Sequence, residues 1–199
     1  MRIMYIFLFS VLFFAQCSPG KSKSKNEEVF QGNEPEQNVA DLIAKAKKYN
    51  KVGVGLLKKE PEKALQAFRK AMKIDPRLPD YPNNAGVALL QQKRFQEAIP
   101  YFQKSVAIQK KYTRGHYNLG VAYQNAKLYH KAIPAYHKAI QLSPKSAEIY
   151  FNLAISYEKS GDKQQALRFY RKFIATAPPR RANIVKDAKK KIQELKKKS

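Results

Sequence analysis

The residues able to do chemistry in this 199-residue chain are few and far apart. Its three histidines are His116, His130 and His137, and the last two, two helical turns apart, share one face of any helix that contains them. A third ligand does not stand beside them, and zinc sites in proteins use three or four protein ligands. The sequence has no glycine-rich phosphate-binding loop and no HExxH motif. We therefore predict a non-catalytic protein without metal, cofactor or small-molecule substrate, and interpret His130 and His137 as solvated.

The one cysteine, Cys17, excludes an intrachain disulfide and a Cys-x-x-Cys metal or redox site. It follows a basic start and an apolar run over residues 3–15, which has the length of a signal-peptide core and is too short to cross a bilayer. Residues 1–16 are therefore predicted to be a signal peptide. Residues 17–36 are rich in Lys, Ser, Glu, Asn and Gln, and their composition is typical of a flexible tether.

The end of the apolar run, Phe14-Ala15-Gln16-Cys17, resembles the lipobox of bacterial lipoproteins. In that family the signal is cut before the cysteine, whose thiol carries lipid such as palmitate. The resemblance implies lipidation at Cys17 and export to a bacterial membrane, most simply the outer membrane, facing the periplasm or the surface. The alternative is a plain secretory peptide in which Cys17 is incidental.

The chain is strongly basic, with 39 Lys and Arg against 15 Asp and Glu and a net charge of +24. Such a charge favours an anionic partner, either nucleic acid or a membrane surface. Export disfavours nucleic acid, because an exported protein is separated from cytoplasmic DNA and RNA. Hydrophobic residues make up 44% of the chain, which is enough to bury a core and excludes wholesale disorder.

A regular repeat, with a period of about 34 residues, organises the chain after the tether. An alanine recurs once in each period, and an aromatic residue follows it by four positions, on the same face of a helix. A glycine, or alanine in the last unit, precedes each pair. These three series are Ala64, Ala98, Ala132 and Ala166; Phe68, Phe102, Tyr136 and Tyr170; and Gly53, Gly86, Gly120 and Ala154.

This register predicts two antiparallel helices in each unit, with the small residues allowing close approach and the aromatic side chain filling the next gap. One unit cannot bury both faces, so units must stack. The third unit, with Tyr117-Asn118-Leu119-Gly120 and Pro144, resembles the tetratricopeptide repeat. The resemblance implies an all-α fold, an α-solenoid of four helix pairs over residues 37–178. The four units are placed at 46–78, 79–112, 113–146 and 147–180.

Residues 179–199 are predicted to form a basic capping helix. Its apolar side chains fall on one stripe, with lysines elsewhere, as expected for a helix with one face to bury. The stripe consists of Ile184, Val185, Ala188, Ile192 and Leu195.

In tetratricopeptide repeats the first helices line a concave groove, so the resemblance implies a peptide or protein partner there. Asn84, Asn118 and Asn152 take equivalent groove positions, and two roles stay open for them. Their amides could pair with an extended peptide backbone, or they could hold neighbouring helices together. The remaining predicted groove residues are Tyr117, Val121, Gln124, Phe151 and Ile155, with Val87 beside them.

A second set of positions makes the predicted second helices basic. Lys70, Lys104, Lys138 and Lys172 follow the same repeat period, with Arg168 and Arg171 close by. Such a face is either simply solvated or attracted to anionic lipid. The sequence therefore predicts a scaffold lipoprotein that binds a protein or peptide partner at the cell envelope. The alternative is a basic solenoid whose main partner is anionic membrane lipid or another polyanion.

Overall fold

A computed structural model describes residues 38–197 of the chain, and all regular elements in this range are helices. Cys17, the predicted signal peptide and the predicted tether lie outside the described residues. The helices are α1 Val39–Leu56, α2 Pro61–Ile74, α3 Asp80–Gln91, α4 Phe95–Ile108, α5 Thr113–Asn125, α6 Tyr129–Leu142, α7 Ala147–Ser160, α8 Lys163–Thr176, the short 3-10 helix η1 Pro179–Arg181 and α9 Ala182–Lys197.

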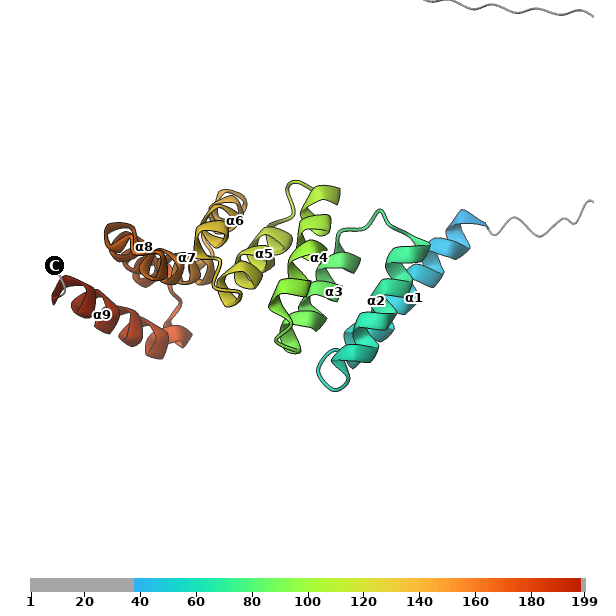
Figure 1. Cartoon of the computed structure of the whole chain (residues 1–199), viewed down its shortest axis with the longest axis horizontal. Coiled ribbons are helices and arrows are strands. Elements are labelled where there is room, and N and C mark those ends of the chain that lie inside the picture. The colour runs from blue at the N-terminus through green and yellow to red at the C-terminus, as the bar shows by residue number, and fades with distance from the viewer. Residues whose placement is uncertain (1–37, 198–199) are drawn as a thin grey trace, which may run out of the picture. The chain divides into compact units, whose positions relative to one another are not determined.

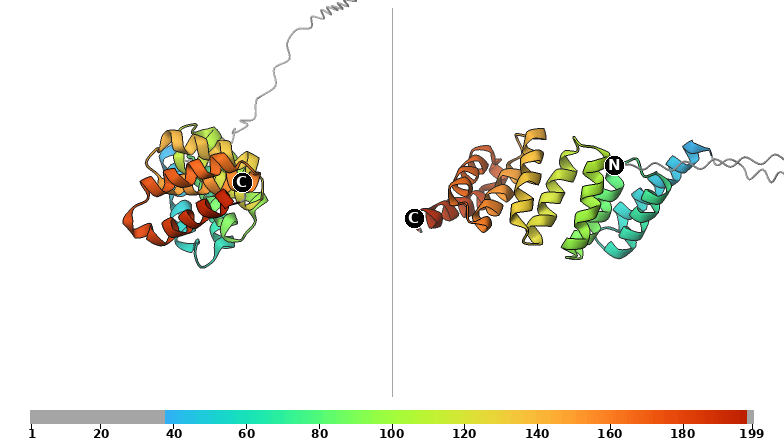
Figure 2. Two further views of the ribbon diagram at one scale, coloured as in Figure 1. Left: turned by 90° about the vertical axis from the view of Figure 1, so that its left-hand side faces the viewer. Right: turned by 45° about the horizontal axis from the view of Figure 1, so that its top comes forward.

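The helices pack in chain order as antiparallel pairs (Figure 1). The pairs are α1–α2, α3–α4, α5–α6 and α7–α8, and each second helix also packs on the first helix of the next pair. The first helices α3, α5 and α7 contact one another in turn, and two further views show the same succession (Figure 2). The predicted all-α solenoid of four helix pairs is confirmed.

The buried core repeats the period of the sequence. The alanines and aromatic residues of the two repeating series are all at most 1% exposed. At Gly86 the helices approach so closely that an added Cβ would lie 2.7 Å from the ring of Phe102. The small residue and the ring therefore set the spacing within each pair, as the sequence predicts.

The turns inside the pairs use a left-handed backbone position. Gly161 takes it after α7, with φ of 92°. After α3 and α5 the equivalent residues are Lys93 and Lys127, with φ of 59° and 60°. This conformation crowds the Cβ atom of a lysine, whereas glycine has no Cβ. The turns at Lys93 and Lys127 are therefore locally strained.

Helix α9 continues the repeat beyond the fourth pair. Ala188 follows Ala154 by one full period of the repeat and, like it, is fully buried. The ion pairs Arg181–Glu148 (3.3 Å) and Lys191–Glu158 (3.3 Å) join α9 and the turn before it to the two ends of α7. The other four residues of its apolar stripe pack on the core formed by the third and fourth pairs. α9 therefore occupies the place of a fifth first helix and covers the end of the solenoid.

None of the helices described for residues 38–197 is both long enough and apolar enough to cross a membrane.

Candidate functional site

The predicted groove residues all lie on first helices, and we call the surface formed by α3, α5 and α7 the first-helix face. All eight are half-buried. Asn84 is on α3; Tyr117, Asn118, Val121 and Gln124 are on α5; Phe151, Asn152 and Ile155 are on α7.

The asparagines of this face join successive first helices. The Nδ2 of Asn84 donates to Asn50 (2.9 Å) on α1, and the Nδ2 of Asn118 donates to Asn83 (2.8 Å) on α3. The Nδ2 of Asn152 donates to the hydroxyl of Tyr117 (3.0 Å) on α5. Of the two roles considered for these asparagines, the bonds therefore show the one of holding neighbouring helices together.

The same asparagines keep unused hydrogen-bonding capacity. The Oδ1 atoms of Asn118 and Asn152 have no partner among residues 38–197, and each amide has a second N–H besides the one donated. Val121 and Ile155 follow these asparagines by about one helical turn along the same face. Each of α5 and α7 therefore offers a free amide oxygen beside a half-buried aliphatic side chain.

Two predicted wall residues serve the internal packing. The Oε1 of Gln124 accepts from Tyr136 (3.1 Å) and from Ser156 (2.9 Å), so its oxygen is used between α5, α6 and α7. The ring of Phe151 lies 4.9 Å, between centroids, from that of Phe173. For these two residues the structure shows a packing role where the sequence suggests an open wall.

Two carboxylates near the amino ends of first helices, Asp80 on α3 and Glu148 on α7, are each held by a tyrosine and an arginine. Glu148 accepts from the hydroxyl of Tyr117 (2.9 Å) and pairs with Arg181. Burial and then the charge of Glu148 raise the pKa of Tyr117, so its hydroxyl stays protonated and able to donate. These carboxylates are not predicted from the sequence, because their partners come from neighbouring repeats.

A pocket of about 440 Å³ opens between the third and fourth repeats. It lies where the turn before α5 meets the turn before α7. Its lining consists of Lys111, Tyr112, Thr113, Arg114, Tyr117, Ser143, Ser146, Glu148 and Ile149. Its volume is within the range of about 300–1,000 Å³ found for ligand sites. Of these residues only Tyr117 was predicted from the sequence.

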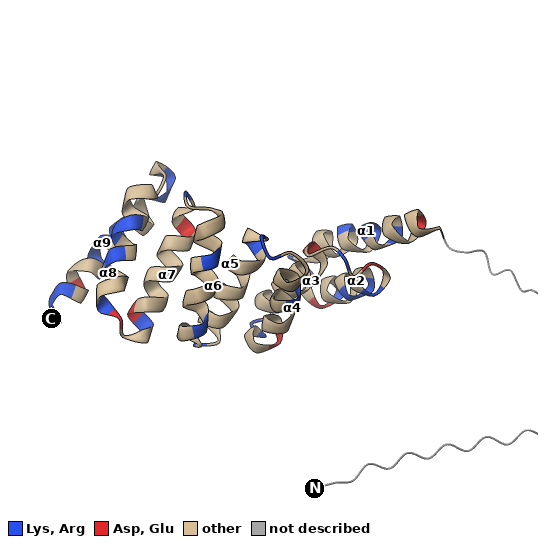
Figure 3. Ribbon diagram, turned by 90° about the horizontal axis from the view of Figure 1, so that it is seen from above, with Lys and Arg blue, Asp and Glu red and all other residues tan. Residues whose placement is uncertain are grey.

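The predicted basic residues all lie exposed on second helices: Lys70, Lys104, Lys138, Lys172, Arg168 and Arg171. None of the six forms an ion pair within residues 38–197. The ammonium groups of Lys70 and Lys172 lie over the rings of Tyr49 (5.6 Å) and Tyr150 (5.7 Å). Figure 3 shows the excess of Lys and Arg over Asp and Glu along the described helices.

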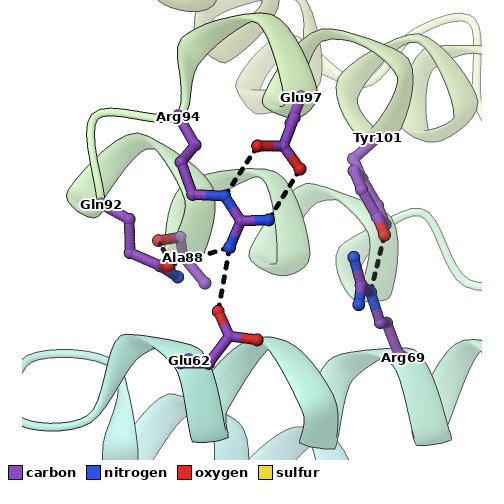
Figure 4. Close-up of polar contacts among 7 residues, drawn as sticks. All are labelled: Glu62, Arg69, Ala88, Gln92, Arg94, Glu97 and Tyr101. Atoms are coloured by element: carbon purple, nitrogen blue, oxygen red, sulfur yellow. Dashed lines mark hydrogen bonds and ion pairs between the residues drawn. The ribbon is translucent and has the colours of Figure 1, made fainter.

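An arginine cluster links the second helices of the first two repeats (Figure 4). Arg94 binds both carboxylate oxygens of Glu97 (2.8 and 2.7 Å) and also Glu62 of α2 (3.0 Å). Beside it, Arg69 of α2 donates to the hydroxyl of Tyr101 on α4 (2.8 Å). The hydrogen bonds from Arg94 lower the pKa of Glu97. These contacts fix the two repeats relative to each other and leave Arg69 and Arg94 less available to a partner.

The two histidines of α6 differ in environment. His130 is exposed, but His137 is half-buried and its Nε2 lies 2.8 Å from the hydroxyl of Tyr157. The ring of Phe169 stands edge-on to His137 at 5.5 Å. His137 is therefore not the solvated residue that the sequence suggested. Within residues 38–197, no group of three or more His, Cys, Asp or Glu side chains is placed to hold a metal ion.

Models of the tetratricopeptide repeat match residues 59–112 and residues 112–178. Together these matches span more than half of the chain, and they coincide with helices α2 to α8. The chain belongs to the tetratricopeptide repeat family. A comparison with curated proteins found no match.

Solved structures with the same fold include three that span much of the described region. MamA from Desulfovibrio magneticus RS-1 is 21% identical, with a TM-score of 0.64 over 78% of this chain and 97% of its own. YrrB, described as a tetratricopeptide repeat protein with an unusual peptide-binding site, is 23% identical, with a TM-score of 0.65 over 73% and 74%. The first such domain of Spaghetti (RPAP3), bound to an HSP90 peptide, is 24% identical, with a TM-score of 0.58 over 59% and 94%.

Proposed function

We propose that this tetratricopeptide repeat protein is a non-catalytic scaffold that binds an extended peptide segment of a partner protein on its first-helix face. The observation that carries the proposal is the pair of free amide oxygens on Asn118 and Asn152, each one turn from an aliphatic side chain. An extended backbone can donate its N–H groups to such oxygens whatever its sequence, and the aliphatic groups give contact area.

Two of the structural relatives support this proposal. YrrB is described as having a peptide-binding site, and the RPAP3 domain is bound to a peptide. Both share the stacked helix pairs of this chain, so the comparable surface exists here. At these identities the likeness concerns the fold alone. Which peptide this chain would prefer therefore depends on its own side chains.

The proposed place of action is the bacterial cell envelope. Its support is the apolar run that ends at Cys17 and the resemblance of residues 14–17 to a lipobox. A lipid on Cys17 together with the basic body would supply two membrane signals, which stable anchoring requires. Metabolic labelling with radioactive palmitate should mark the wild-type chain and leave Cys17→Ser unlabelled. Equal labelling of both chains would contradict lipidation at this residue.

The binding proposal is tested with peptides selected from a random displayed library. Val121→Glu places a charge among the aliphatic contacts of α5 and should weaken a selected peptide at least tenfold. Gln66→Glu is the matched control: it makes the same change of charge on exposed α2 and should leave binding within about twofold. Thermal unfolding of both variants checks the fold. Equal loss in the two variants would exclude the first-helix face as the site.

A second candidate function rests on the six exposed basic residues of the second helices, which lack ion pairs within the described part of the chain. These residues could attract anionic lipid, with each basic group near the surface adding about 1 kcal/mol. Vesicles with and without anionic lipid separate the two functions. Binding that depends on anionic lipid, falls with salt and persists in Val121→Glu would favour the second candidate.

A further inference from the structure

One side of each of the helices α3, α5 and α7 is buried against the second helix that precedes it in the chain. Helices α2 and α3, α4 and α5, and α6 and α7 pack together in this way. At the second of these contacts, a Cβ added to Gly115 of α5 would lie 2.9 Å from Val106 and 3.1 Å from Ser105, both on α4. No helix precedes α1 in the part of the chain that the structure describes, so the corresponding side of α1 lacks this neighbour.

Three residues of α1, at steps of four and three, mark this side of the helix: Lys48, Val52 and Gly55. The repeating glycine or alanine fixes their register, since they lie five residues before, one before and two after Gly53. The residues at the same distances in α3, α5 and α7 are all buried: Tyr81, Gly115 and Ile149; Ala85, Leu119 and Leu153; Ala88, Ala122 and Ser156. In α1 all three are exposed, and we call them the end face of α1.

The end face of α1 is open to another helix. Val52 is 47% exposed, and a Cβ added to Gly55 would meet no atom within 4 Å. An open glycine beside an exposed valine lets a second backbone come close and cover apolar surface. The opposite end of the array is already covered by α9 (Figure 1). The alternation of first and second helices can therefore continue at the end face of α1.

The charges around the end face are mainly positive and are not balanced. Lys45, Lys48 and Lys51 form no ion pair within the described chain, and Asp41 is the one acidic residue of α1. Figure 3 shows the basic segments of this helix. A helix laid over the end face would bury the ammonium group of Lys48, which is costly unless a carboxylate pairs with it. An occupant of this face must therefore be acidic.

We propose that the end face of α1 docks an acidic amphipathic helix of a partner protein, which takes the place of a second helix before the first repeat. A carboxylate of that helix pairs with Lys48, and its apolar side chains cover Val52 and Gly55. A second copy of α1 fits poorly, because it would bring the same lysines opposite one another. The end face is distinct from the first-helix face, so this interaction goes beyond the proposed function.

Two exposed valines of α1 provide matched variants for the test. Val54 is 52% exposed, close to the 47% of Val52, but a step of two residues puts their side chains on nearly opposite sides of the helix. Val54 takes the repeat position of Val121, which belongs to the first-helix face. Val52→Asp and Val54→Asp therefore change charge and helix propensity equally and differ in the side of α1 that they alter.

The test uses the full chain and two displayed libraries of amphipathic helices, one with Glu and one with Lys at its polar positions. We expect binders from the acidic library. Val52→Asp should weaken them at least tenfold and Val54→Asp less than about twofold. Thermal unfolding of both variants checks that the fold is kept.

A charge exchange tests the role of Lys48. Lys48→Glu should weaken a selected acidic helix about tenfold, and changing one Glu of that helix to Lys should restore most of the loss. Lys47→Glu is the control, since Lys47 is also exposed but lies about a quarter of a turn away from Lys48. It should leave binding within about twofold.

Four results would overturn the inference. Equal loss in Val52→Asp and Val54→Asp would indicate a general effect of charge, and equal success of the basic library would exclude the pairing with Lys48. A dimer of the chain in sedimentation, dissociated by Val52→Asp, would assign the end face to a second copy. Failure of both libraries would leave the face without a helical partner. None of these results affects the peptide selection on the first-helix face, which is tested through Val121.

Discussion

The ring of Tyr136 lies directly against the backbone of Gly120, so that a Cβ at Gly120 would be 2.5 Å from a ring carbon. Tyr136 is fully buried and its hydroxyl is bonded to Gln124, so the ring cannot move aside freely. Gly120→Ala should therefore lower the free energy of unfolding by about 1 kcal/mol, because the cost of overpacking exceeds the gain in helix propensity. Urea unfolding followed by circular dichroism measures the change.

Gly55→Ala is the control for this substitution. An added Cβ at Gly55, also in a first helix, meets nothing within 4 Å. Only the helix propensity changes there, so stability should rise by about 0.5 kcal/mol. The same sign for both variants would contradict the packing explanation.

Lys93 and Lys127 occupy the left-handed turn position that Gly161 takes in the fourth repeat. Replacing either lysine by glycine should stabilise the protein by about 0.5–1 kcal/mol, because the strain on the lysine Cβ disappears. Lys104→Gly, in the interior of α4, should instead cost about 1 kcal/mol. Differential scanning calorimetry reports the shifts, and a lower melting temperature for Lys93→Gly and Lys127→Gly would refute the assignment of strain.

Asp75 is a buried carboxylate that should make the stability depend on acid pH. It is 4% exposed and accepts hydrogen bonds from the Nε (2.7 Å) and backbone N–H (3.2 Å) of Arg77. These bonds lower its pKa below the ordinary value of 3.8, although burial opposes them. The stability that ionised Asp75 contributes is therefore complete above pH 3.8. It is lost as the pH falls through the lower pKa of the folded state.

Asp75→Asn should lower the free energy of unfolding at pH 7 by about 1–3 kcal/mol, since a hydrogen-bonded charge is removed. The difference between wild type and variant should shrink as the pH falls below 3.8. Guanidinium unfolding at a series of pH values gives this difference directly. If the difference in free energy of unfolding stayed constant as the pH fell below 3.8, Asp75 would not act through its charge.

His137 should give a second, separate pH dependence nearer neutrality. Burial, and then the charges of Arg168 and Lys172, lower its pKa below 6.5, so the unfolded chain takes up this proton at higher pH than the folded chain does. The free energy of unfolding should fall as the pH drops from 6.5 through the folded-state pKa, by at most about 1.4 kcal/mol for each pH unit. His137→Gln should lack this component. If the free energy of unfolding of the variant fell with pH as steeply as that of the wild type, this pH dependence would belong to another residue.

Much of the fold follows from the sequence because the repeat is local and regular. The step from Ala132 to Ala166 and the ring four positions after each predict the helix pairs and their packing. The apolar stripe that includes Ala188 predicts which face of α9 is buried. The repeat also places Asn118 and Asn152 on equivalent first helices.

The parts that could not be predicted depend on contacts between repeats. The use of Gln124 depends on Tyr136 and Ser156, which lie on two other helices. The surroundings of His137 come from α7 and α8 in the same way. The pocket beside Arg114 is lined by residues of two repeats, from the turns before α5 and α7, so neither repeat alone predicts it.

Hydrogen–deuterium exchange of the full chain, with and without a saturating selected peptide, tests the central claim most directly. Peptide binding on the first-helix face should slow exchange in α5 and α7, around Asn118 and Asn152, and leave the exposed surface of α4 and α6 unchanged. Slower exchange confined to the second helices, around Lys104 and Lys138, would contradict the account and favour the polyanion function.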